Sequence, residues 1–185
     1  MGQDGKEGRR RGGGFTLVEL VMGVAIAAIL AAAAGPSFAR FLAEQRLLDE
    51  ARRLSDAILV ARSEAIKRNG VVILCTLAPG GECGEADRWH SGWMAFEDRD
   101  GDGEPGADDP LVPVAEPAAA GGITIAGNGP VERYLRFTWA GNARLVSGAL
   151  QMGTFTVCRS GLRGYRVVLA NTGRTRIERL ADECA

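Results

Sequence analysis

The first part of the chain carries one long run of apolar residues. Residues 15–34 are twenty positions, of which only Thr16 and Glu19 are clearly polar. A helix of that length is about 30 Å long, which matches the hydrocarbon core of a bilayer. The pattern therefore predicts a helix that can span a membrane.

The helical pattern continues past this run, but with a single apolar face. Apolar residues recur every three or four positions, and most charged residues lie off that face. The members of the face are Phe38, Phe41, Leu42, Leu48, Ala51, Leu54, Ile58, Ala61, Ala65 and Ile66. Asn69 and Gly70 suit a helix end, because both residues tolerate a left-handed backbone. We expect one helix from Phe15 to about Arg68.

After Gly70 the period of the pattern changes to two, and clusters of turn-forming residues separate the segments. The predicted strands are 71–77, 89–96, 111–114, 123–126, 134–139, 154–159, 163–169 and 175–180. A helix followed by short strands indicates an α+β fold. We therefore predict a long N-terminal helix packed on an antiparallel β-sheet head, with Trp89, Trp93 and Trp139 in its core.

Length and charge limit the possible functions. The 185 residues leave enough chain for one globular head beyond the apolar run. The formal net charge is -1, and residues 1–14 contribute +2 from four bases and two acids, so the remainder is close to -3. The head has no general basic field for nucleic acid, and any such binding needs a local patch.

A possible cleavage site precedes the apolar run instead of following it. In an ordinary secretory signal, small residues after the apolar core mark the cut, and the core is lost. Here the glycines end at Gly14, and a cut after Gly14 keeps the helix on the mature protein. The alternative is an ordinary signal cut within residues 31–35, which would leave Glu19 in the signal core without a role. A carboxylate inside a bilayer costs several kcal/mol and needs a partner.

Four cysteines in a head outside the cytoplasm are expected to be paired. Three pairings are possible, and Cys75–Cys83 with Cys158–Cys184 closes the smallest loops. The first pair brackets a turn, and the second pins the C-terminal end to a late strand. A four-thiolate zinc site needs closely spaced cysteine pairs, which the sequence lacks.

An acidic turn fits most of a calcium-loop pattern. Asp98, Asp100 and Asp102 alternate before Gly103, and Asp109 stands at the twelfth position. The fit is incomplete, because Asp replaces the usual Glu and the flanking segments are predicted strands. Asp and Gly also suit a solvated turn without metal. We assign no metal site and no cofactor.

No arrangement of residues suggests catalysis. The single histidine is His90, the cysteines are expected to be bridged, and neither a phosphate loop nor a nucleophile elbow is present. We expect no catalytic residues and no enzyme activity.

Arginines cluster near the C-terminus. If 175–180 is a strand, Arg174 and Arg176 point to the same face, about 7 Å apart. That spacing suits successive phosphates of a nucleic acid, with Arg179 as a further candidate contact. The alternative is an edge strand kept soluble by its charges.

Four segments carry a resemblance to one protein group. Residues 14–20 read Gly-Phe-Thr-Leu-Val-Glu-Leu, and residues 59–69 read Leu-Val-Ala-Arg-Ser-Glu-Ala-Ile-Lys-Arg-Asn. Gly92-Trp93 precedes the acidic turn, and residues 173–176 form a Gly-Arg-x-Arg motif. With these motifs the whole chain resembles the FimT/GspH group of minor pilins and pseudopilins.

The resemblance implies a division of the chain and a set of partners. Residues 1–14 are a leader that prepilin peptidase removes after Gly14, and Phe15 is then N-methylated. Residues 15–36 lie in inner-membrane lipid and later in the filament core, where Glu19 meets the N-terminal amine of a neighbouring pilin subunit. Residues 37–185 form the head, with a half-helix over 37–69 and a β-rich part over 71–185.

The same resemblance implies a location and a function. The chain is a single-pass protein of the bacterial inner membrane with its head in the periplasm, and then part of a cell-surface pilus or a periplasmic pseudopilus. In FimT-like minor pilins the Gly-Arg-x-Arg motif is associated with capture of double-stranded DNA for natural transformation, which maps onto Arg174 and Arg176. The alternative is a GspH-like pseudopilin of a type II secretion system that does not bind DNA.

The position of the cut gives a first test. Sequencing of the mature N-terminus should return Phe15, because the small-residue site lies before the apolar run, and the resemblance implies that this residue is N-methylated. A mature chain that begins at Gly35 or close to it would mean an ordinary secretory signal and a soluble product.

Overall fold

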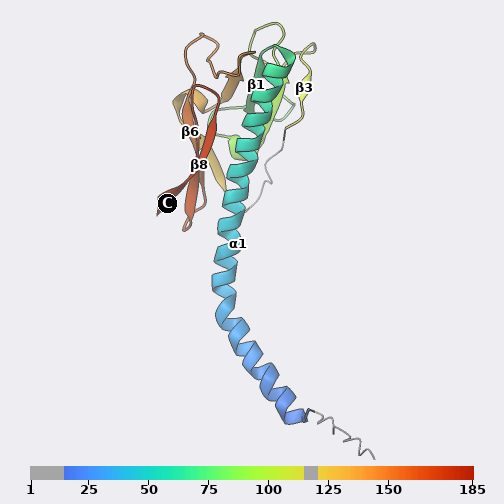
Figure 1. Cartoon of the computed structure of the whole chain (residues 1–185), viewed down its shortest axis with the longest axis vertical. Helices are drawn as coiled ribbons and strands as arrows, with labels where there is room; N and C mark the ends of the chain where they lie inside the picture. The colour runs from blue at the N-terminus through green and yellow to red at the C-terminus, as the bar shows by residue number, and fades with distance from the viewer. Residues whose placement is uncertain (1–14, 115–120) are drawn as a thin grey trace, which may run out of the picture. The chain divides into compact units, whose positions relative to one another are not determined.

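The computed structural model describes residues 15–114 and 121–185. Within these residues the chain forms one long helix, two short 3-10 helices and eight strands (Figure 1). In chain order they are α1 (Leu17–Arg68), β1 (Val72–Thr76), η1 (Trp89–Ser91), β2 (Trp93–Glu97), β3 (Leu111–Val112), β4 (Thr124–Gly127), η2 (Gly129–Val131), β5 (Tyr134–Phe137), β6 (Gly153–Cys158), β7 (Arg163–Leu169) and β8 (Thr175–Glu183). The predicted α+β fold, with its long N-terminal helix, is confirmed.

Helix α1 belongs to two compact units of the chain. Its first part, up to Phe41, falls in one unit, and Leu42–Ala185 forms the other, the head. Within the first unit, Leu17–Gly35 has a mean hydropathy of 2.4, and all its described side chains are exposed. By length and composition this segment can cross a membrane.

The strands form two antiparallel sheets of four strands each. The order in the first is β3-β2-β1-β5, and the order in the second is β4-β6-β7-β8. The sequence predicts the strands but not this division, because strand partners are chosen by contacts between distant segments. Val72 of β1, for example, pairs with Phe137 of β5. Strand β8 lies at an edge of the second sheet.

The head part of α1 supplies one face to a core that both sheets share. Seven of its side chains are fully buried: Leu47, Ala51, Leu54, Ala57, Ile58, Ala61 and Ala65. They form one cluster with Leu74 and Phe137 of the first sheet and with Phe155 and Val167 of the second. The spacing of three and four residues puts these side chains on one stripe, so a single helix can cover both sheets.

The helix ends in a Schellman motif. Asn69 has a left-handed backbone with φ of 52°. Its N–H donates to the carbonyl of Ile66 at 3.2 Å, and the N–H of Gly70 donates to the carbonyl of Ala65 at 3.1 Å. These bonds satisfy carbonyls that the helix end would otherwise leave open, and the chain then turns into β1.

An ion pair network fastens the end of α1 to β2. Arg68 donates through Nε to Glu64 at 2.8 Å and through Nη1 to Glu97 at 2.9 Å. These hydrogen bonds hold the pKa of both carboxyl groups below the ordinary range, with smaller contributions from Lys67 on Glu64 and from Arg99 on Glu97. Both carboxylates thus favour the charged form.

Two tryptophan predictions were wrong in detail. Trp89 is buried as expected, but it lies in η1 and the strand begins only at Trp93. Its indole N–H donates to the carbonyls of Val131 and Glu132, which ties η1 to η2 instead of extending the ladder. Trp139 is 63% exposed, because it lies in the turn that follows β5 and not in the core.

Candidate functional site

The first turn of α1 contains a capping box around Glu19. Thr16 precedes the helix, and both its backbone N–H and its hydroxyl donate to Glu19 Oε2 at 2.9 Å. The N–H of Glu19 donates back to the Thr16 hydroxyl at 3.3 Å. The sequence Thr16-x-x-Glu19 is the signature of this motif, so the spacing alone was a sufficient signal for it.

This arrangement gives the membrane-segment carboxylate a local partner. Both Thr16 groups use the same oxygen, so Oε1 of Glu19 has no hydrogen bond among the described residues. The side chain of Phe15 is 90% exposed beside it. Gly14, the expected cleavage residue, lies outside the described residues. Glu19 can accept a further donor from a neighbouring chain without losing its helix cap.

The cysteines are joined as the sequence analysis favours. Disulfides link Cys75 to Cys83 and Cys158 to Cys184. The second disulfide holds the end of β8 beside β6.

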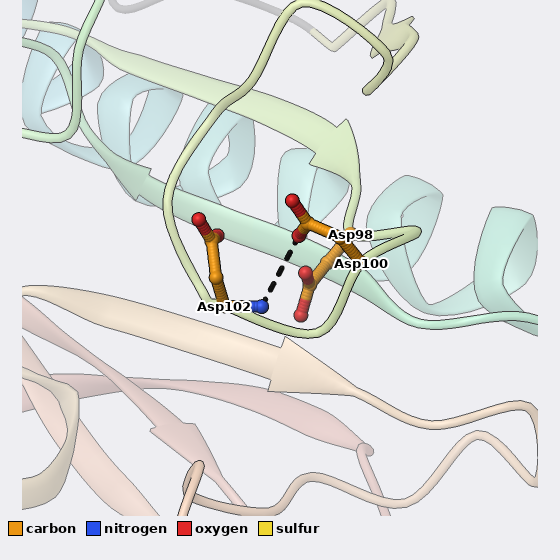
Figure 2. A group of neighbouring side chains, drawn as sticks. All are labelled: Asp98, Asp100 and Asp102. Carbon is orange, nitrogen blue, oxygen red and sulfur yellow. Dashed lines mark hydrogen bonds between the residues drawn. The ribbon is translucent and has the colours of Figure 1, made fainter.

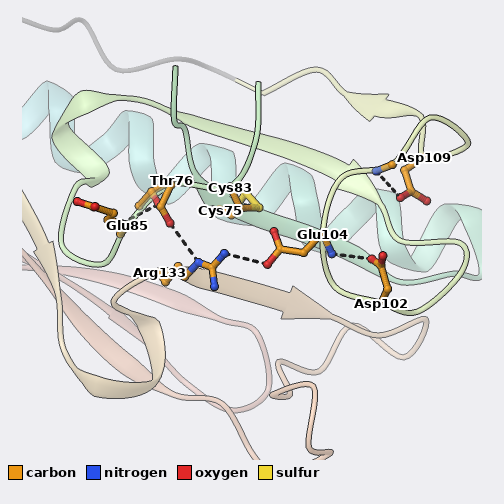
Figure 3. The surroundings of a disulfide bond; sticks show 10 residues. Cys75, Thr76, Cys83, Glu85, Asp102, Glu104, Asp109 and Arg133 are labelled. Carbon is orange, nitrogen blue, oxygen red and sulfur yellow. Dashed lines mark hydrogen bonds and ion pairs between the residues drawn. A yellow bond between two sulfur atoms is a disulfide. The ribbon is translucent and has the colours of Figure 1, made fainter. Parts of the chain in front are cut away.

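Arg133 connects the loop closed by the Cys75–Cys83 disulfide to the acidic loop after β2 (Figure 3). Its Nε donates to the carbonyl of Gly84, and its Nη2 donates to Glu104 at 2.8 Å.

The C-terminal arginines lie on the β7–β8 hairpin at the sheet edge. Arg174 precedes β8 and is exposed, and Arg176 is exposed within it. In the ladder, Arg176 is opposite Val168 and Glu178 is opposite Arg166. Arg166, Arg176 and Glu178 therefore share the outer face, since residues directly opposite each other point to the same side of a sheet.

Glu178 holds Arg176 on that outer face. The Nε of Arg176 lies 2.6 Å from Oε1 of Glu178, and both side chains are about half exposed. An exposed pair of this kind contributes little to stability, so a stronger anion can displace the carboxylate. Arg166 is far from Arg176 in the sequence pattern, and only the register of the ladder brings it close to Arg176 on this face.

Arg179 does not lie with Arg174 and Arg176. It is opposite Tyr165 in the ladder and thus on the face of β8 that looks toward the helix. There its Nη2 donates to Glu44 of α1. The strand alternation separates it from the outer face, so its contact fastens the hairpin to the helix.

The glycine of the Gly-Arg-x-Arg motif is required by packing. Gly173 has a φ of +76°, and a Cβ there would lie 2.4 Å from the carbonyl oxygen of Gly141 and 2.7 Å from Arg62 Nε. Arg62 itself donates to that Gly141 carbonyl at 2.9 Å. Arg62, from the motif over residues 59–69, and Gly173, from the Gly-Arg-x-Arg motif, thus both pack against Gly141. This packing fixes the turn that precedes Arg174.

The acidic turn brings together three of the four aspartates that fit the calcium-loop pattern. Asp98, Asp100 and Asp102 each offer a carboxylate oxygen, and these oxygens lie within 4.8 Å of one another. Figure 2 shows the three side chains inside the ring that the loop traces. Asp109 is not in this group, because its carboxylate accepts from the backbone N–H groups of Arg99 and Gly106.

Comparison with known proteins identifies two sequence families and one fold. The family described as "Type II transport protein GspH" matches residues 50–173, and the prokaryotic N-terminal methylation motif matches residues 9–35. The fold is similar to the type IV minor pilin FimU of Pseudomonas aeruginosa PAO1, with a TM-score of 0.54 and 22% identity over 75% of this chain and 92% of that one. A second crystal form of FimU gives a TM-score of 0.48, with 21% identity over 71% and 91%. No curated protein matches the chain significantly.

A pair of glycine substitutions tests the packing at Gly173. Gly148 has a similar φ of +84° but open space around its Cβ position. Gly148→Ala should therefore cost only backbone strain, about 1 kcal/mol. Gly173→Ala adds a collision with backbone and should cost more than about 3 kcal/mol in thermal unfolding of the full chain in detergent micelles. Equal losses in the two variants would show that the close approach to Gly141 is not required.

Proposed function

Because the chain belongs to the GspH family of pilin-type structural proteins, we propose that it is a minor pilin of a type IV pilus whose head binds double-stranded DNA for uptake in natural transformation. The coarser assignment is a minor pilin or pseudopilin of a type IV pilus or a type II secretion system. Proteins of this kind are processed by prepilin peptidase and assemble with other pilin subunits.

The proposal begins with processing and membrane insertion. Prepilin peptidase cuts after Gly14 and Phe15 is methylated, in agreement with the methylation motif over residues 9–35. The helix from Leu17 then anchors the chain in the inner membrane with the head in the periplasm. On assembly, Glu19 meets the N-terminal amine of the neighbouring subunit, and the two charges neutralise each other.

The observation that supports DNA binding is the exposed arginine pair at the tip of the β7–β8 hairpin. Arg174 and Arg176 are both exposed, and their separation of about 7 Å along the strand suits successive phosphates. Arg166 lies diagonal to Arg176 on the same outer face and adds a third cation. Arg179, which the sequence suggested as a further contact, is paired with Glu44 on the other face and is not among the proposed DNA contacts.

The negative charge of the rest of the head limits the range and the strength of DNA binding by this patch. The mature chain is close to -3, so attraction to DNA is local to the hairpin. Phosphate contacts release counterions, and binding through a few arginines should be weak and should decrease steeply with salt. Such contacts carry no base readout, so binding should not depend on DNA sequence.

The second candidate is a pseudopilin of a type II secretion system that does not bind DNA. The observation that favours it is the Arg176–Glu178 pair on an edge strand. Alternating charges on an exposed edge prevent pairing with other sheets, and that role needs no ligand.

A gel shift with double-stranded DNA and the full chain in detergent micelles tests the proposal. Arg174→Ala/Arg176→Ala should weaken binding at least about tenfold and lower the slope of log affinity against log salt by about 2, because two phosphate contacts are lost. Glu178→Gln should strengthen binding, because it removes the carboxylate that competes for Arg176.

The matched control removes the same charge elsewhere on the head. Arg52 and Arg53 are exposed on α1 and belong to neither strand of the hairpin. Arg52→Ala/Arg53→Ala should leave binding within about twofold of the wild-type value. If both double variants weaken binding equally, the hairpin is not the site, and if the wild-type chain does not retard DNA, the pseudopilin alternative holds.

A further inference from the structure

We propose that the loop after β2 binds one calcium ion through Asp98, Asp100 and Asp102. This site lies in a different loop from the arginine hairpin, and the inference does not depend on DNA binding. The sequence pattern alone did not favour a metal, because its twelfth position carries Asp and its flanks are strands. The structure supplies two observations that the pattern lacks.

The first observation is an unsatisfied oxygen in a buried carboxylate. The side chain of Asp98 is 0% exposed, and its Oδ2 has no hydrogen-bond partner. The nearest cation among the described residues is Arg136, whose Nε lies 3.9 Å away, too far for a hydrogen bond. A buried carboxylate oxygen without a donor is costly, and a bound cation removes that cost.

The second observation is the position of the other two carboxylates. Ligand oxygens lie about 2.3 to 2.6 Å from a calcium ion, so two ligands of one ion are at most about 5 Å apart. One oxygen from each of the three aspartates meets this limit, since all lie within 4.8 Å of one another (Figure 2). Three carboxylates and one nearby guanidinium leave two negative charges, which a divalent cation balances.

The loop backbone holds these side chains in place while leaving oxygens for an ion. Asp98 Oδ1 accepts from the N–H of Gly101 at 2.9 Å, Asp100 Oδ1 from that of Asp102 at 3.2 Å, and Asp102 Oδ1 from that of Glu104 at 2.8 Å. In each aspartate this hydrogen bond uses Oδ1, and no hydrogen bond to the Oδ2 of any of the three is found among the described residues.

Two contacts outside the cluster close the loop. Asp109 accepts from the N–H groups of Arg99 and Gly106 at 2.9 Å, so it acts as a clasp and not as the twelfth-position ligand of an EF-hand. Arg133 ties Glu104 to the disulfide loop (Figure 3). The remaining ligands would be backbone carbonyls and water, as is usual for calcium. Zinc is disfavoured because the cluster offers only carboxylate oxygens.

Equilibrium dialysis with radiolabelled calcium, using the full chain in detergent micelles, tests the proposal. We expect one ion per chain with a Kd on the order of 0.1 to 1 mM, the range of extracellular modules, and a rise in the thermal unfolding midpoint. Magnesium at the same concentration should give a smaller rise, because it demands a stricter geometry.

Asparagine variants assign the site. Asp98→Asn and Asp100→Asn/Asp102→Asn keep the Oδ1 acceptors that hold the loop but remove the charges, and they should abolish both binding and the rise in midpoint. Asp108→Asn removes an exposed charge from the same loop outside the cluster and should bind as the wild type does. The proposal is overturned if the wild-type chain binds no calcium at about 10 mM, or if the cluster variants bind as well as Asp108→Asn does.

Discussion

A carboxylate inside an apolar helix is the constraint on which the architecture depends. Glu19 lies near the start of the segment that is long and apolar enough to cross a membrane. In lipid an ionised side chain costs several kcal/mol, so it persists only with a partner. Thr16 supplies a local one through the capping box, and it occupies a single oxygen of the carboxylate. The arrangement stabilises the helix start in the isolated chain and leaves Glu19 able to accept a donor from another subunit.

The same helix also organises the head. Its apolar stripe forms one cluster with residues of both sheets, and only a small second cluster around Ile73, Cys75 and Phe96 of the first sheet lies apart from it among the described residues. The parts of the head that can carry function are loops and edges held against this frame. Arg62 and Gly173 fix the C-terminal turn to the helix, Arg179 fastens β8 to Glu44, and Arg133 connects the disulfide loop to the acidic loop. Exposed arginines and clustered aspartates are thus presented on rigid supports at different places.

The local sequence pattern was enough to predict the helix and the strands, but the strand partners and the contacts at the candidate sites depend on tertiary structure. The helix, the eight strands and the end at Asn69 follow from periodicity and from turn residues, which act over a few positions. The division into two sheets could not be predicted, because Val72 meets Phe137 across a long stretch of sequence. Trp89 lies in η1 and not in the predicted strand, and its indole N–H donates to the carbonyls of Val131 and Glu132. At the candidate sites, the motifs identified Arg174, Arg176 and the aspartates. The burial of Asp98 and the role of Asp109 as a clasp depend on neighbours that no spacing reveals.

The most direct test of the central claim is the incorporation of a Glu19→Ala chain into filaments. Purified filaments from cells that express the variant would be probed for the subunit, with Glu85→Ala, an exposed head carboxylate, as the matched control. The account predicts that the Glu19 variant is inserted in the membrane and cleaved but is largely missing from filaments, because no carboxylate meets the amine of the neighbouring subunit. Incorporation at the level of the Glu85 variant would contradict the claim that this charge pair drives assembly.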